Sequence, residues 1–184
     1  MYLMRRRLDG YGTDPLIASL VDGLQIWIVP ILNPDGHLYV EEHTSGQSSS
    51  WWRKNRRVNG DGTFGVDLNR NYGYLWGYDN FGSSPMTSSE VYRGTGPFSE
   101  PEAAAFRDFI AAHQFRVSAS FHSYGELVLY PWGYGLLDTP DHPIFQALGD
   151  SIAAQSGYLA GNPKSGAIYI TNGDMDDWVY GDAA

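Results

Sequence analysis

The distribution of apolar and polar positions predicts strands in three parts of the chain. Residues 25–32 (QIWIVPIL) are almost uniformly apolar, which is typical of a strand covered on both faces of a sheet. Residues 116–122 alternate apolar and polar side chains, so His122 ends the predicted strand on its polar face. Residues 127–130 predict a third, shorter strand.

Helical periodicity is clearest after Ser99. Ser99 and Glu102 form a capping-box pattern, and Pro101 is compatible with the first turn of a helix. Apolar residues then follow at helical spacing. Residues 143–156 predict a second helix and residues 15–21 a short one. Strands that alternate with helices indicate an α/β fold, with a mixed central β-sheet flanked by helices.

Turn and loop signals separate these elements. Residues 9–12 and 33–36 (NPDG) are rich in turn-forming residues. Residues 44–50 and 59–65 are predicted loops. Residues 73–97 form a long irregular region, and its aromatic residues favour an ordered structure over a disordered one.

Composition limits the function classes. A chain of 184 residues with 15% aromatic residues fits one folded domain, and we find no repeat or domain boundary within residues 1–184. The net charge of −9 argues against nucleic acid as the main partner. The absence of cysteine excludes disulfides and thiolate zinc sites. No apolar run approaches the ~20 residues of a membrane span, and residues 1–7 resemble the end of an amphipathic helix, not a secretory signal.

A basic run at residues 52–56 (WRKNR) is the first candidate for chemistry. In isolation it is best interpreted as a solvated basic turn. A nucleic-acid patch with Trp51 and Trp52 for stacking is a second interpretation, which the net charge opposes. The third is a carboxylate or oxyanion site, because guanidinium is a planar and permanently charged donor.

Residues 67–71 (DLNRN) are more specific. Adjacent Asn69 and Arg70 can bind a carboxylate with several donors, and Asp67 can orient a neighbouring imidazole by accepting its N–H. The alternative is a polar loop with internal hydrogen bonds, which we retain for Asn71.

His122 differs from the other histidines by its position. It ends a predicted strand and precedes a break in regular structure, and strand ends line ligand crevices in α/β sheets. A lone histidine is more often structural, which is our interpretation for the remaining four: His37, His43, His113 and His142.

Together these runs resemble the zinc carboxypeptidase family, which includes carboxypeptidases A, B and T. The family has motifs of the form W-R-K-x-R, D-x-N-R-N and H-S-Y followed by L-x-x-Y-P, in this order. The segments that match these motifs are residues 52–56, 67–71, 122–124 and 127–131. Residues 33–36 match the family's N-P-D-G turn, and residues 168–169 and 173–178 match its tyrosine-bearing loop. The resemblance extends over essentially the whole chain.

The resemblance implies roles for three residues at a zinc centre. The family releases the C-terminal residue of peptides and binds Zn through two His and one Glu. His122 matches the third ligand. Asp67 matches the acceptor that orients the first ligand histidine. Arg53 matches the arginine that polarises the scissile carbonyl and stabilises the developing oxyanion, a role worth ~3 kcal/mol.

The resemblance also implies a substrate pocket. Asn69 and Arg70 match the pair that binds the terminal carboxylate, and Tyr169 matches the tyrosine that closes over bound substrate. Asp176 matches the floor of the side-chain pocket, where an acid accompanies a preference for Lys or Arg. A broad specificity like that of carboxypeptidase T stays open.

Two features of the family are missing from this sequence. No H-x-x-E motif, the source of the first two ligands, occurs in it. The catalytic Glu is expected about a dozen residues after Trp178, beyond Ala184. The resemblance therefore implies a partial domain that lacks N-terminal and C-terminal elements, has one of three zinc ligands and is inactive alone. The alternative is a non-catalytic domain that binds peptide C-termini.

Further expectations follow from the resemblance. The parent protein is expected to be extracellular or periplasmic and monomeric, with peptide or protein C-termini as partners. The bonds Ser123–Tyr124 and Pro131–Trp132 match family positions with cis peptides.

Overall fold

The computed structural model describes residues 2–44 and 51–182, and its backbone forms two compact units, Met1–Pro34 and Asp35–Ala184. The predicted loop at 44–50 therefore lies mostly outside the described residues. None of the helices in the described ranges is long and apolar enough to cross a membrane.

The first unit contains helices α1 (Tyr2–Gly10) and α2 (Pro15–Gly23). Asp14 caps α2, because its Oδ1 accepts hydrogen bonds from the backbone N–H groups of Leu16 at 3.0 Å and Ile17 at 3.3 Å. The short helix predicted at residues 15–21 is confirmed.

The strand predicted at residues 25–32 is wrong for the described structure. This segment belongs to no β-ladder in residues 2–44 and 51–182, and its apolar side chains are largely exposed, with Ile28 at 42% and Val29 at 50%. A strand forms only where a neighbouring strand exchanges backbone hydrogen bonds with it. The other regular elements in the described part of the first unit are helices, so residues 25–32 have no such neighbour there.

A helix forms where a turn was predicted, and all but its first residue belongs to the second unit. Residues 33–36 do not form an isolated turn, since Pro34 opens helix α3 (Pro34–His43). Proline suits this place because the first helical N–H groups have no intrahelical acceptor. The remaining elements of the unit are η1 (Leu68–Arg70), α4 (Pro101–Ala111), β1 (Leu127–Leu129), α5 (His142–Ser156), β2 (Leu159–Gly161) and α6 (Met175–Gly181).

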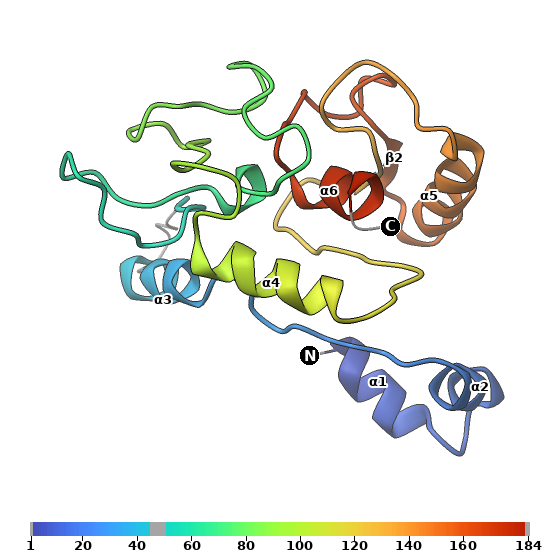
Figure 1. The fold of residues 1–184 in the computed structure, drawn as a ribbon. Coiled ribbons are helices and arrows are strands. Elements are labelled where there is room, and N and C mark those ends of the chain that lie inside the picture. The colour runs from blue at the N-terminus through green and yellow to red at the C-terminus, as the bar shows by residue number, and fades with distance from the viewer. Residues whose placement is uncertain (1, 45–50, 183–184) are drawn as a thin grey trace. The chain divides into compact units, whose positions relative to one another are not determined.

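The sheet of the described residues consists of β1 and β2, which run parallel with Leu127 opposite Leu159. Helix α5 connects them and lies beside β2 in Figure 1. Gly149 lets the helix approach closely, because a Cβ there would lie 2.9 Å from the Tyr130 ring. The fold is therefore α/β, with a smaller sheet than the sequence predicted.

Two local predictions around α4 are corrected. Residues 116–122 form no ladder in the described structure, although their pattern alternates. Ser99 does not cap α4; its hydroxyl donates to Glu100 at 2.8 Å and accepts from Asn71 at 3.0 Å. The hydroxyl is occupied by tertiary partners, so the local pattern misidentified its role.

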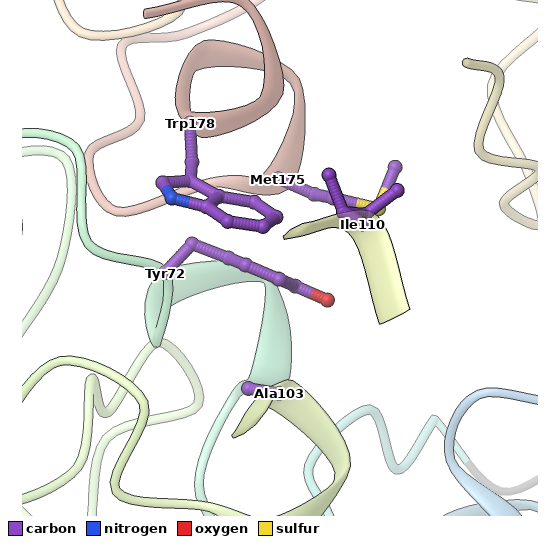
Figure 2. Packing of buried hydrophobic residues seen from close by; sticks show 5 residues of the cluster. All are labelled: Tyr72, Ala103, Ile110, Met175 and Trp178. Carbon is purple, nitrogen blue, oxygen red and sulfur yellow. The ribbon is translucent and has the colours of Figure 1, made fainter. Parts of the chain in front are cut away.

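A buried cluster joins the segment after η1 to helices α4 and α6. Tyr72 and Trp178 stack with ring centroids 5.5 Å apart, and Ala103, Ile110 and Met175 surround them (Figure 2). This packing holds the start of α6 close to residues 67–72. Gly173 completes the junction, because a Cβ there would lie 2.6 Å from the Arg70 carbonyl oxygen.

The segment from 51 to 59 is fixed to α4 by a buried carboxylate. Glu100 is 1% exposed and accepts hydrogen bonds from Asn55 at 2.8 Å and from Arg57 at 2.6 Å. This network positions the backbone next to Arg53.

Candidate functional site

Asp67 lies at the centre of the candidate site, one residue before η1. Its side chain is buried, and Oδ1 accepts the Asn69 N–H at 3.1 Å. Oδ2 has no hydrogen-bond partner, and the Arg70 guanidinium is 4.0 Å away. A buried carboxylate oxygen without a donor is costly, so this atom is suited to accept one more N–H.

Asn69 and Arg70 present further donors. Asn69 Oδ1 accepts the backbone N–H of Met175 at 3.0 Å, which orients the amide with its Nδ2 as the remaining donor group. Arg70 donates to the Asn69 carbonyl at 2.6 Å, is only 2% exposed, and its Nε has no partner. The pair therefore combines a partly exposed amide with a buried guanidinium that has an unmet donor.

His122 lies close to these charged groups. Desolvation lowers the pKa of His122, as do the positive charges of Arg53 and Arg70, whereas Asp67 and Asp174 raise it. Its Nε2 is 3.0 Å from the Ser120 hydroxyl. The neutral imidazole is thus favoured, which is the form that binds metals.

Helix α6 adds three carboxylates. Asp174 caps the helix, accepting the Asp177 N–H at 2.9 Å and the Thr171 hydroxyl at 2.5 Å. Asp177 accepts the backbone N–H groups of Gly133 at 2.8 Å and Tyr134 at 2.9 Å. Burial and Asp174 raise the pKa of Asp177, while those two N–H groups lower it.

Asp176 is the carboxylate of α6 that solvent reaches. Its residue is exposed, yet the surrounding protein desolvates it and, together with Asp174, raises its pKa to about 7. Such a group changes charge near neutral pH.

Tyr169 lies on the segment before α6 and is 64% exposed. Within the described residues, no hydrogen bond, ion pair or ring contact joins its side chain to Asn69, Arg70 or His122. The segment is anchored further on by Asn172, which is fully buried and donates to Asp79 at 2.7 Å. The structure thus brings Arg53, Asp67 and Arg70 within electrostatic range of His122. Asn69 and Asp176 are connected to this group through the start of α6.

The described residues do not suffice for a zinc site. In residues 2–44 and 51–182, no group of three or more His, Cys, Asp or Glu side chains could bind a metal ion. His122 has the right chemistry for one ligand, and one protein ligand does not complete a tetrahedral zinc site. Both predicted cis peptide bonds, Ser123–Tyr124 and Pro131–Trp132, are confirmed.

Comparison with known proteins identifies the family. The family profile described as zinc carboxypeptidase matches residues 1–184. The chain belongs to the zinc carboxypeptidase family. The resemblance drawn from the sequence motifs is therefore confirmed.

Individual relatives of this family are similar over nearly the whole chain. The zinc carboxypeptidase of Saccharothrix mutabilis subsp. capreolus is 36% identical over 189 residues, covering 97% of this chain and 42% of that protein. Mast cell carboxypeptidase A of Rattus norvegicus is 34% identical over 182 residues, covering 92% of this chain and 42% of the relative. This chain thus spans about two fifths of the length of these relatives.

Solved structures of the family have the same fold. Thrombin activatable fibrinolysis inhibitor is similar with a TM-score of 0.83 at 28% identity, covering 97% of this chain and 47% of that chain. Carboxypeptidase A from Helicoverpa armigera has a TM-score of 0.73 at 30% identity, covering 92% of this chain and 44% of the other. The predicted α/β carboxypeptidase-like fold is confirmed.

Sequence reasoning missed Asp174 and Asp177. Asp174 caps α6 and acts electrostatically on both His122 and Asp176, and Asp177 attaches α6 to residues 133–134. The available signal was an acid followed three residues later by a second acid, just before Trp178, which is typical of a helix start.

Proposed function

We propose that this chain forms the substrate-recognition part of a zinc metallocarboxypeptidase that releases C-terminal residues from peptides. The main support is the donor set of Asn69 and Arg70 beside His122 and the unpaired Asp67 oxygen. Donors that lack protein partners next to a histidine suit an anionic substrate group.

Asn69 and Arg70 bind the terminal carboxylate in this proposal. The Asn69 amide is fixed by the N–H of Met175, so its Nδ2 donates without first being ordered. The adjacent Arg70 is buried, has an unmet Nε donor and adds a permanent positive charge. We therefore expect an exopeptidase, because a stretch of substrate peptide without a free C-terminal carboxylate lacks the group that these donors bind.

Arg53 acts at the scissile carbonyl. Its charge lowers the pKa of His122, so the guanidinium lies within electrostatic range of the imidazole. A fixed cation at the carbonyl oxygen stabilises the charge that develops when the bond is attacked. Tyr169, exposed on its loop, covers the bound C-terminal residue.

Asp176 selects the substrate side chain. It is the exposed carboxylate on the first turn of α6, and its neighbours include Asp174. A pocket floor of this charge favours C-terminal Lys or Arg, and a broad specificity is the second option.

His122 is one zinc ligand in this proposal. The unpaired oxygen of buried Asp67 suits the N–H of a further ligand histidine, which the described residues do not supply. We therefore expect these 184 residues alone to be inactive. The parent is proposed to be extracellular or periplasmic and monomeric, with peptide C-termini as its partners.

A non-catalytic peptide-binding domain is the second candidate. It is favoured by the donor pair of Asn69 and Arg70 together with the lack of a group of metal ligands in the described residues. Both candidates share the carboxylate site, so binding is tested first and catalysis second.

The binding test compares acetyl-Ala-Ala-Lys as the free acid and as the C-terminal amide, by isothermal titration calorimetry. We expect the acid to bind at least about tenfold more tightly, since a charged hydrogen bond is worth about 1.5–3 kcal/mol. Asn69→Ala should abolish this discrimination, while Phe81→Ala, at an exposed residue outside the site, should keep it. Equal affinities for acid and amide contradict the proposed site.

The catalytic test adds zinc. The chain incubated with zinc and the free-acid peptide should release no lysine. Zinc-dependent release that His122→Ala abolishes would contradict the expected inactivity of the chain alone. A longer chain from the same gene that releases lysine favours the peptidase, and one that binds without release favours the non-catalytic candidate.

A further inference from the structure

We infer that Arg56 is a positioning residue for Arg53, and that it acts by holding the loop of residues 52–56 against three aromatic rings. The inference rests on the proposed function, because it requires that Arg53 contacts the substrate carbonyl. In this role Arg56 does not touch the substrate, but it fixes the place of a residue that does.

The four basic residues within 53–57 have different surroundings. Lys54 is 2% exposed, and its Nζ donates to two backbone carbonyl oxygens at 3.1 and 3.2 Å. Arg57 donates to a buried carboxylate at 2.6 Å. Arg56 is partly buried, whereas Arg53 is exposed. The run is therefore not a uniformly solvated basic turn, because several of its cations are built into the fold.

The Arg56 guanidinium lies over three aromatic rings. Its Cζ is 3.8 Å from the ring centroid of Tyr39, 4.5 Å from that of Trp52 and 4.8 Å from that of Phe64. A cation within about 6 Å of a ring centroid is attracted by the negative face of the ring. Because Tyr39 belongs to α3, Arg56 connects its own loop both to that helix and to Phe64.

A guanidinium suits these rings better than an ammonium would. It is planar, so it can stack on an aromatic face, and it is more weakly hydrated than an ammonium. The rings also contact one another and their surroundings. Tyr39 stacks on His43 with centroids 3.9 Å apart, and its centroid is 5.1 Å from that of Trp52. Arg56 thus binds to rings that are already held in place.

Trp52 connects this arrangement to Arg53, its neighbour in the chain. The Trp52 Nε1–H donates to the Asn55 carbonyl at 3.2 Å, which closes the loop. Gly65 packs closely against it, since a Cβ there would lie 2.4 Å from the Asn55 carbonyl oxygen and 2.9 Å from the Trp52 ring. Arg53 is therefore attached to a fixed backbone. A donor that is already in place needs little ordering when charge develops on the substrate carbonyl.

The test is a double-mutant cycle of Arg56→Ala and Arg53→Ala on the complete chain, with the binding of acetyl-Ala-Ala-Lys measured by isothermal titration calorimetry. We expect Arg56→Ala to weaken binding about 3- to 10-fold when Arg53 is present, and to have no further effect when Arg53 is already replaced. The ratio of affinities for the free acid and the amide should not change, because the Asn69 amide is held by the backbone of α6.

Chemical rescue adds a second measurement. Arg56→Ala leaves the three rings accessible to a free guanidinium ion, so millimolar guanidinium chloride should recover much of the lost affinity. Potassium chloride at the same concentration should not, and the wild type and Arg53→Ala should gain nothing. The matched control is Arg107→Ala, which removes another guanidinium, 5.1 Å from the Phe98 ring, and should bind the peptide as the wild type does.

The other outcomes overturn the inference. An equal loss of affinity in both backgrounds would show that Arg56 does not act through Arg53. Unchanged affinity in a folded Arg56→Ala, or in Arg53→Ala, would show that the peptide does not depend on this loop. If circular dichroism shows that Arg56→Ala is unfolded, Arg56→Lys takes its place, and unchanged affinity of that variant also overturns the inference. Equal binding of acid and amide by the wild type contradicts the proposed function itself.

Discussion

At the scale of single residues, the charge of Asp176 determines whether the proposed pocket attracts a cation. The carboxylate is reached by solvent, yet desolvation and Asp174 raise its pKa to about 7. Below that pH the group is neutral, and above it the group is negative. The affinity for a peptide ending in Lys should therefore increase as the pH rises through about 7. The affinity for a peptide ending in Leu should change little over the same range.

Calorimetry at pH 6 and pH 8 measures this effect as the ratio of the two affinities. We expect the Lys-to-Leu ratio to be several-fold higher at pH 8, because a cation gains a counter-charge only from the ionised acid. Asp176→Asn should make the ratio independent of pH. A ratio that rises equally in Asp176→Asn would assign the titration to another group.

The buried hydroxyl of Tyr72 leads to a second prediction at the scale of single residues. Its hydroxyl is buried and has no hydrogen-bond partner, and burial raises the pKa of the phenol. A buried polar atom without a partner costs about 1–3 kcal/mol. Tyr72→Phe keeps the ring stacked on Trp178 and removes that atom.

Urea unfolding of Tyr72→Phe should therefore give a free energy of unfolding equal to or about 1 kcal/mol above that of the wild type. Tyr72→Ala is the contrasting variant. Its free energy of unfolding should fall by about 3–5 kcal/mol, because removal of the ring leaves a cavity in the buried cluster. A marked loss of stability in Tyr72→Phe would indicate a bonded hydroxyl.

At the scale of elements, the ion pair of Arg57 and Glu100 couples residues 51–59 to α4. Glu100 is 1% exposed, so it has lost its hydration and depends on its partners. Arg57→Leu leaves Asn55 and Ser99 as donors to this carboxylate. We expect a loss of about 2–3 kcal/mol in unfolding free energy, measured by urea titration.

The matched control is an exposed ion pair in the other unit. Arg5 and Asp9 are 3.8 Å apart with side chains 84% and 73% exposed, and such pairs contribute below about 1 kcal/mol. Arg5→Leu should therefore change stability little. Similar losses in both variants would show that burial of Glu100 does not determine the strength of its pair.

At the scale of the whole molecule, the sequence predicted the family, the α/β class and helices α2, α4 and α5, because these depend on local patterns and ordered motifs. It predicted strands at 25–32 and 116–122, where the described structure has no ladder. A strand depends on a partner that its own sequence does not specify.

The candidate site divides in the same way. Motifs predicted Asp67, Asn69, Arg70 and His122, and their roles stay predictions; the structure places Asp67 and Arg70 within electrostatic range of His122 and bonds the Asn69 N–H to Asp67. The capping role of Asp174 and the burial of Glu100 depend on contacts across the fold, so local pattern could not predict them. Tyr169 stays a prediction, since its exposed side chain has no described contact with the others.

Exposed apolar surface on α5 leads to the last prediction. Ile144, Leu148 and Ile152 follow one helical face and are 61%, 52% and 53% exposed. Such a stripe should bind a hydrophobic dye and promote self-association.

Substituting all three residues by Gln should lower dye fluorescence and the weight-average mass in analytical ultracentrifugation. The triple substitution should barely reduce the free energy of unfolding, because these side chains bury little area. Val58→Gln, at another exposed apolar residue, should change neither. Large destabilisation by the triple substitution would mean that the stripe is packed in solution, and unchanged dye binding would locate the accessible apolar surface elsewhere.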